Sequence, residues 1–318
     1  VDLEADGWAN RKVEVPLPEA KGGYALIVDL GEHGRRYLVS CVRVFKPQPS
    51  DNPFPSQAMD NLRDPRILAR LGIRSVRFGG VDYVPTNHPD YEQHMKEMAK
   101  QLRAYEEAGV MVTAEVGFSP KAQQPLGRGR PHLTKHGVMK DGKQDLVWSP
   151  KHDQDYKEFI YQVAKRFGYP NGPINGFMLW NEPWEGASIS GWQADMLRYR
   201  KLYRLMGDAV MQAREDAGVD VLIGGCDSTS NTWDKLFPRG IENSKFWPEY
   251  VDFISLHYQG LSTPALYRAL RNREHYKGRV RIWDTESWIA NTDDRFLGMA
   301  AATRAAGFDR VLGSLVRV

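Results

Sequence analysis

The sequence predicts an α/β protein whose fold is a (β/α)8 TIM barrel, and three observations support this prediction. From about residue 36 onward, short apolar runs alternate with helical patterns, which is typical of βαβ units that form a parallel sheet. Glycine follows several helical patterns, as in Leu71-Gly72-Ile73 and Ala108-Gly109-Val110, where a left-handed residue ends a helix. The chain has 318 residues, and such a barrel typically takes about 250.

The apolar runs indicate where the strands lie. Between the runs, apolar residues recur at steps of three and four, which predicts one buried face of a helix. One such series is Trp192, Met196, Tyr199, Tyr203, Met206 and Val210. The strands are expected near residues 37–45, 74–79, 110–116, 175–182, 220–225, 251–258, 280–286 and 308–315. This is the number of strands that closes a barrel of this kind.

The two ends of the chain depart from this rhythm. The apolar run 24–30, a glycine-bounded turn at 31–34 and the run that begins at Arg36 predict a β-hairpin that leads into the barrel. We therefore expect residues 1–35 to be a separate β segment, as at the edge of an accessory β-sandwich, and residues 36–318 to be the barrel. No helical pattern follows the last strand, so we expect the barrel to be truncated at its C-terminal end.

Composition bears on partners and location. The formal net charge is only +3, so charge does not call for a nucleic-acid partner. No run approaches the roughly 18 apolar residues of a membrane span, so no membrane association is expected. The chain begins with Val-Asp-Leu-Glu and shows no leader pattern. A removed leader would mean a secreted or periplasmic protein, and a cytoplasmic location is the alternative.

Two glutamates stand where two predicted strands end. Glu182 belongs to Asn181-Glu182-Pro183, directly after the apolar run 177–180, and Glu286 closes the run 280–285. Hydrolysis of a glycosidic bond needs two carboxyl groups, one as a proton donor and one as a nucleophile or base. Catalytic groups of a parallel barrel lie at the C-terminal ends of its strands. The pair therefore predicts a glycosidase.

This arrangement resembles the clan A glycoside hydrolases over roughly residues 36–315. The resemblance implies a general acid/base at the end of the fourth strand and a nucleophile at the end of the seventh. The expected strand order places Glu182 on the fourth strand and Glu286 on the seventh. It further implies retaining hydrolysis of a β-linked glycan or glycoside by double displacement, with no metal and no organic cofactor, since two carboxylates and water supply the chemistry.

The resemblance also implies roles for other strand-end residues. Asn181 would bond the sugar 2-hydroxyl, and Arg77 would bond the nucleophile and keep it ionised; the alternative for Arg77 is an ion pair with an acidic neighbour such as Asp82 or Glu115. His257 and Tyr258 end the sixth strand, where family members carry a histidine and a tyrosine that bonds the nucleophile. In several members the aromatic residue comes two positions after the histidine, where this chain has Gln259.

Because successive side chains of a strand face opposite ways, Asn181 and Glu182 can both reach the site only if the backbone is irregular there. Trp184 and Trp288 follow the two glutamates closely, and indole rings stack on the apolar faces of sugars. Trp148 is the third candidate sugar contact. It lies in the basic segment 117–152, which would read a sulfate or carboxylate on an anionic sugar; a solvated surface loop is the alternative.

Other functions remain to be separated from hydrolysis. A carbohydrate-binding barrel without turnover would share the scaffold, but it would not need both glutamates. A metal-dependent barrel hydrolase would need clusters of His and Asp at strand ends, which the sequence does not show. A transglycosylase would use the same residues and differ only in the acceptor.

Overall fold

The computed structural model describes residues 12, 14–43, 52, 53, 55, 57–60, 64–118, 132–134, 137–139, 152–181, 196–225, 251–257, 281–287, 305 and 307–314. The chain divides into two compact units, Val1–Pro47 and Gln48–Val318. Among the described helices, none is long and apolar enough to cross a membrane.

The first unit is an antiparallel hairpin. Strands β1 (Gly22–Asp29) and β2 (Arg35–Arg43) pair along their whole length and are joined by a short 3-10 turn, η1 (Gly31–His33). The prediction that residues 37–45 form the first barrel strand is therefore wrong, because β2 pairs with β1. The division between the units correspondingly falls after Pro47 and not after residue 35.

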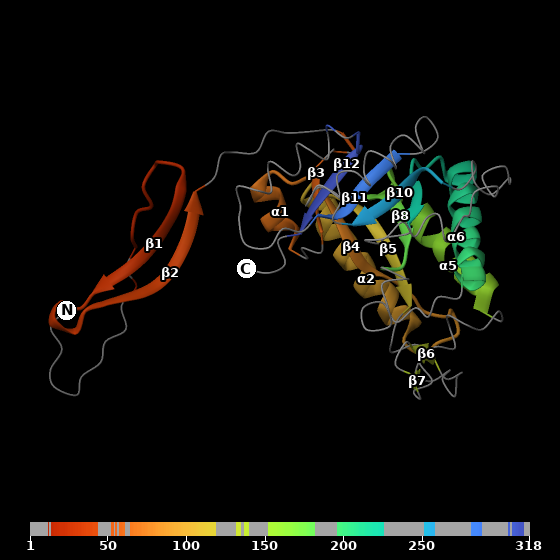
Figure 1. The fold of residues 1–318 in the computed structure, drawn as a ribbon, viewed down its shortest axis with the longest axis horizontal. Helices are drawn as coiled ribbons and strands as arrows, with labels where there is room; N and C mark the ends of the chain where they lie inside the picture. Colours follow the sequence, from red (N-terminus) through yellow and green to blue (C-terminus); the bar gives the residue numbers. More distant parts are fainter. Residues whose placement is uncertain are drawn as a thin grey trace. The chain divides into compact units, whose positions relative to one another are not determined.

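In the second unit, parallel strands form one closed barrel (Figure 1). Every neighbouring pair in this barrel runs parallel, which confirms the predicted α/β class. In chain order, the strands are β3 (Gln57–Asp60), β4 (Ser75–Tyr83), β5 (Met111–Phe118), β8 (Ile174–Leu179), β9 (Leu222–Gly225), β10 (Phe253–His257), β11 (Arg281–Ser287) and β12 (Arg310–Ser314). A separate antiparallel pair, β6 (His132–Thr134) and β7 (Gly137–Met139), lies between β5 and β8 in the sequence.

Strand β3 takes the place of the strand expected at 37–45. It pairs with β12 on one side and with β4 on the other. The pattern missed it because Gln57–Asp60 is only four residues long and contains no β-branched or aromatic residue. The replacement leaves the later strands in their expected places, so β8 is the fourth described barrel strand along the chain and β11 the seventh.

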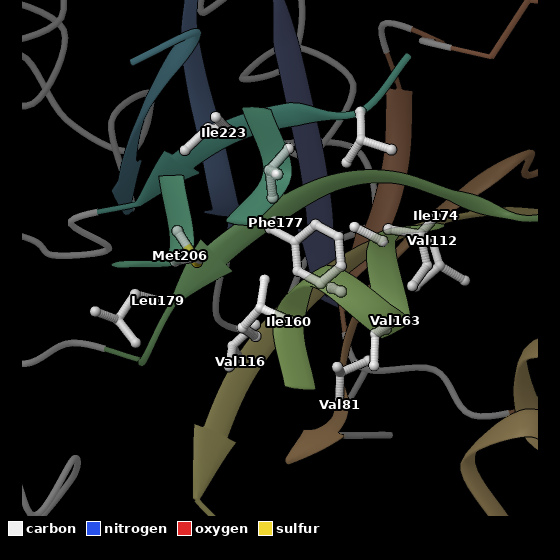
Figure 2. Packing of buried hydrophobic residues seen from close by; sticks show 14 of the residues in the cluster. Val81, Val112, Val116, Ile160, Val163, Ile174, Phe177, Leu179, Met206 and Ile223 are labelled. Carbon is white, nitrogen blue, oxygen red and sulfur yellow. The ribbon is translucent and has the colours of Figure 1, made fainter. Parts of the chain in front are cut away.

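The described helices are α1 (Pro65–Leu71), α2 (Tyr91–Glu107), α5 (Asp153–Phe167) and α6 (Met196–Ala217). Their apolar faces bury against the outward-facing residues of the strands, which alternate along each strand. Figure 2 shows Ile160 and Val163 of α5 beside Phe177 of β8. This shell of side chains fixes the strands from outside and leaves their inward residues to fill the barrel.

A polar network closes the barrel at the N-terminal ends of its strands. Arg310 lies over the indole of Trp283, 4.1 Å from its ring centroid, and burial lowers the pKa of this guanidinium from its ordinary value. Its Nε donates to the carbonyl of Pro55 at 2.9 Å and its Nη1 to Thr113 at 3.1 Å. Thr113 in turn donates to Asn175 at 3.0 Å. Arg310 and its partners therefore fill the N-terminal end of the barrel, and the candidate active site is sought at the C-terminal end, where such barrels carry their active sites.

Candidate active site

Arg77 of β4 is the centre of the candidate site. Its side chain is buried, and its guanidinium contacts three other elements. Nη1 donates to Oε2 of Glu286 on β11 at 3.1 Å, and Nη2 donates to Oδ1 of Asn181, just after β8, at 2.5 Å. Nη2 also forms an ion pair with Oε2 of Glu115 on β5. One cation thus gathers two carboxylates and an amide that are far apart in the sequence.

Glu286 reaches Arg77 because β11 is irregular. Trp283 faces into the barrel, where it stacks on Phe253 with the ring centroids 3.7 Å apart. A regular strand would place a residue three positions later on the opposite face. The pairing with β10 shifts between Leu256 and His257, so that Thr285 is an extra residue on β11. Such a bulge re-aims the following side chain, and it turns Glu286 inward.

A second irregularity presents Asn181. Trp180 has φ 62°, and among the described residues it is the non-glycine residue with a positive φ. Its amide donates to the carbonyl of Val116 at 3.0 Å, and the hydroxyl of Tyr199 on α6 donates to the carbonyl of Leu179 at 2.8 Å. The backbone irregularity that the sequence led us to expect is therefore present at the residue before Asn181.

His257 also lies where the sequence places it. It is buried at the end of β10, and its Nδ1 lies 3.6 Å from Oε2 of Glu286. The same carboxylate oxygen therefore lies near the cation of Arg77 and the ring of His257. Arg77 and His257 thus lie beside Glu286, and Asn181 joins this group through the hydrogen bond that it accepts from Arg77.

Glu115 was not among the predicted site residues; the sequence offered it as an acidic neighbour that would pair with Arg77, and this ion pair is present beside the one with Glu286. Arg77 pairs in register with Thr113 of β5. Glu115 lies two residues further along the same strand, so strand alternation puts it on the inner face, nearer the C-terminal end. That alternation was the signal available in the sequence.

The remaining predicted site residues, Glu182, Tyr258, Trp148, Trp184 and Trp288, lie outside the described residues. Within the described part of the chain, no group of three or more His, Cys, Asp or Glu side chains is placed to hold a metal ion. The described site is therefore a buried arginine that contacts two carboxylates and an amide, with an imidazole beside one of the carboxylates.

Comparison with known proteins places the fold. No known family matches the sequence, and no curated protein matches it. Among solved structures, a family 39 glycoside hydrolase from Bacteroides cellulosilyticus WH2 matches with a TM-score of 0.57 and 13% identity, covering 92% of this chain and 63% of that one. A glucosidase from Croceicoccus marinus matches with a TM-score of 0.54 and 12% identity, covering 85% of this chain and 61% of that one.

A third match is the family 30 subfamily 8 xylanase from Clostridium acetobutylicum, with a TM-score of 0.53 and 14% identity over 81% of this chain and 63% of that one. The chain thus spans about three fifths of the length of these structures. At such identities the likeness concerns the fold alone. The resemblance to clan A glycoside hydrolases is confirmed at that level, and the chain has the fold of these barrel enzymes.

Proposed function

We propose that the chain is the catalytic (β/α)8 barrel of a retaining glycoside hydrolase that cleaves a β-linked glycan or glycoside. The observation that carries this proposal is the pairing of Arg77 with Glu286 at the C-terminal end of β11. A carboxylate that is turned inward by a bulge and held by a buried cation is fixed in direction, as a nucleophile must be.

In the proposed reaction, an oxygen of Glu286 attacks the anomeric carbon while Glu182 gives a proton to the leaving glycosidic oxygen. The bond to the leaving sugar breaks and a glycosyl ester with Glu286 forms. Glu182 then takes a proton from water, whose oxygen attacks the anomeric carbon and releases Glu286. Two inversions return the original anomeric configuration, and no cofactor is needed.

The contacts of Asn181 suit the role that the family resemblance implies. Its Oδ1 accepts a hydrogen bond from Arg77, so the amide is oriented and its Nδ2 is the donor directed elsewhere. A donor there would bond the sugar 2-hydroxyl, a contact that strengthens as the transition state forms. Arg77 would then orient both the nucleophile and the group that recognises the neighbouring hydroxyl.

The proposed partner is a carbohydrate, an oligosaccharide or polysaccharide. Trp148, Trp184 and Trp288 are the proposed stacking surfaces, and the basic segment 117–152 is the proposed contact for an anionic sugar. The hairpin of β1 and β2 is proposed as the edge of an accessory β-sandwich.

The test is a screen of aryl β-glycosides and defined polysaccharides, sulfated ones included, with wild type, Glu286→Gln and Glu182→Ala. We expect Glu286→Gln to lose hydrolysis by at least about 10³-fold while still binding the substrate. Glu182→Ala should keep activity on aryl glycosides with good leaving groups, which need no acid, and azide should restore its second step. A surface variant, Glu107→Gln on α2, serves as the control.

Each alternative gives a different result in this screen. Binding without turnover by the wild type on every substrate would indicate a carbohydrate-binding barrel. Transfer to an added sugar acceptor, seen in the products, would indicate a transglycosylase. Proton NMR of the first product formed reports its anomeric configuration, and an inverted product would overturn the double-displacement mechanism.

A further inference from the structure

Glu115 uses one of its two carboxylate oxygens in the described site. Its Oε2 forms an ion pair with Nη2 of Arg77, whose side chain is only 4% exposed. The side chain of Glu115 is 20% exposed, so it keeps contact with solvent although its partner is buried. An ion pair with a buried guanidinium fixes the direction of the carboxylate and leaves Oε1 able to accept a further hydrogen bond.

The space beside Oε1 of Glu115 is bordered by a glycine. Gly79 lies where the pairing of β4 with β5 shifts, and a Cβ on it would lie 3.5 Å from Oε1. Among the described atoms outside the adjoining backbone, this Cβ would meet no other within 4 Å. The space beside Oε1 therefore has room for at least a methyl group, and a hydroxyl group of a ligand is of similar size.

A second carboxylate lies near this space. Gly117 is two residues after Glu115 on β5 and so lies on the same, inner face of the strand. The side chain of Asp82 on β4 occupies the place that a side chain on Gly117 would need. Two acids on this part of the barrel disfavour a sulfate or carboxylate group there and favour an uncharged hydrogen-bond donor, such as a sugar hydroxyl.

The neighbours of Glu115 indicate which hydroxyl it would meet. Nη2 of Arg77 contacts both Oδ1 of Asn181 and Oε2 of Glu115, so the amide and the carboxylate lie side by side. The proposed partner of Asn181 is the 2-hydroxyl of the sugar at the cleaved bond. On one side of that hydroxyl lies the anomeric carbon, which Glu286 would attack, and on the other side lies the 3-hydroxyl.

We propose that Oε1 of Glu115 accepts a hydrogen bond from the 3-hydroxyl of the sugar whose glycosidic bond is cleaved, and thereby makes a free 3-hydroxyl a condition of recognition. This inference rests on the proposed function. It sorts substrates by linkage, because a sugar that is extended through its oxygen 3 has no 3-hydroxyl, whereas a 1,4-linked sugar has one. The site therefore favours 1,4-linked over internally 1,3-linked glycans and rejects a 3-sulfate.

The experiment is a cycle between protein and sugar. Wild type and Glu115→Ala are compared on the 4-nitrophenyl β-glycoside that the wild type cleaves best and on its 3-deoxy form. Wild type should lose about 10–100-fold in kcat/KM on the 3-deoxy sugar, the range for a hydrogen bond to a charged group. Glu115→Ala should lose a similar factor on the parent glycoside and show little further loss on the 3-deoxy form. The 4-deoxy form is the control sugar and should affect both proteins alike.

Gly79→Ala tests the geometry with the carboxylate in place. This variant keeps Glu115 and its ion pair but puts a methyl group beside Oε1. We expect kcat/KM on the parent glycoside to fall by at least about 3-fold, because the hydroxyl can no longer approach at a good distance and angle. The 3-deoxy form should be nearly unaffected. Glu107→Gln, on the surface of α2, should behave as wild type does with every sugar.

A binding measurement separates this inference from the proposed function. Calorimetry follows the methyl β-glycosides of glucose, galactose, mannose and xylose, and their 3-deoxy forms, with wild type and Glu115→Ala. If the wild type cleaves no glycoside, but the 3-hydroxyl strengthens binding to wild type and not to Glu115→Ala, the recognition stands and the proposed function fails. If no glycoside binds or is cleaved, both fail.

Other results count against the inference alone. With hydrolysis confirmed, it is overturned if the wild type cleaves the 3-deoxy sugar as well as the parent, or if removal of the 3-hydroxyl costs wild type and Glu115→Ala the same factor. Should Glu115→Ala not fold, Gly79→Ala decides. An equal effect of this variant on the parent glycoside and on the 3-deoxy form would then refute the contact with Oε1.

Discussion

The hydroxyl of Tyr199 donates to the carbonyl of Leu179 at 2.8 Å, and so it ties α6 to the last residue of β8. The next residue, Trp180, takes the positive φ that turns Asn181 toward Arg77. A non-glycine residue in this region costs about 1–3 kcal/mol and persists only where the surroundings impose it. The tyrosine hydroxyl is one group that imposes this turn from outside the barrel.

Tyr199→Phe should therefore affect both stability and activity. Loss of the hydroxyl leaves a buried carbonyl without its donor, which costs about 1–3 kcal/mol in the free energy of unfolding. Because the same carbonyl precedes the strained turn, kcat/KM should also fall. Tyr161→Phe, which loses a hydrogen bond from α5 to Asp216 of 3.0 Å, is the control. It should cost stability and leave kcat/KM unchanged; an equal activity loss in both would contradict the role of Tyr199.

Arg77 cannot be replaced by another cation without loss. Lysine has one ammonium group in place of a planar fork, so Arg77→Lys cannot serve Glu286, Asn181 and Glu115 in the observed geometry. We expect kcat/KM to fall by at least about 10-fold, equivalent to about 1.4 kcal/mol. Arg77→Met should also lower the free energy of unfolding by about 1–3 kcal/mol, since it leaves two partly buried carboxylates without their cation. Urea unfolding and kinetics measure the two effects separately.

Gly79 and Gly80 lie where the pairing of β4 with β5 shifts, between Phe78 and Val81, and they should respond differently to alanine. A Cβ on Gly80 would lie 2.1 Å from Cζ of Phe78, whose ring is buried and packs edge-on against Tyr105. Gly80→Ala should therefore lower the free energy of unfolding by about 1–3 kcal/mol through overpacking. Gly79→Ala meets only an ordinary contact of 3.5 Å and should be nearly neutral in stability. Equal effects in thermal unfolding would contradict this account.

Tyr83 should make the protein less stable at alkaline pH. Burial, and next the hydrogen bond to Asp155, raise the pKa of Tyr83 above its ordinary value. Below about pH 10 the tyrosine is protonated in both states, so its contribution to stability is complete. Above about pH 10 it ionises only in the unfolded chain, and the free energy of unfolding falls by about 1.4 kcal/mol per pH unit.

Tyr83→Phe removes this titration. Urea unfolding at several pH values between about 8 and 11.5 should show a shallower alkaline decline for the variant than for wild type. At neutral pH the variant should be less stable by about 1 kcal/mol, because Asp155 loses one donor but keeps those of Thr86. Parallel alkaline declines in the two proteins would show that Tyr83 titrates alike in both states.

The local order of the chain was readable from the sequence. The apolar faces of the helices, the glycines at their ends and the apolar runs of the strands predict an alternating α/β protein, and Glu286 at the end of one run could be named as a site residue. These features depend on residues close together in the chain, because the spacing of apolar residues indicates which face of a helix or strand is buried. For the same reason β3, which lacks apolar residues at such spacing, was missed, and β2 was assigned to the wrong unit.

What meets at the site was decided by the tertiary structure. The bulge at Thr285 and the positive φ of Trp180 depend on pairing and packing partners that are distant in the chain, and they determine which way Glu286 and Asn181 point. The sharing of Arg77 between Glu286 and Glu115 joins residues on three strands. Closure of the barrel brings these charges together. The spacing of residues along one strand predicts which face a side chain occupies, but it does not predict which side chains of other strands lie beside it.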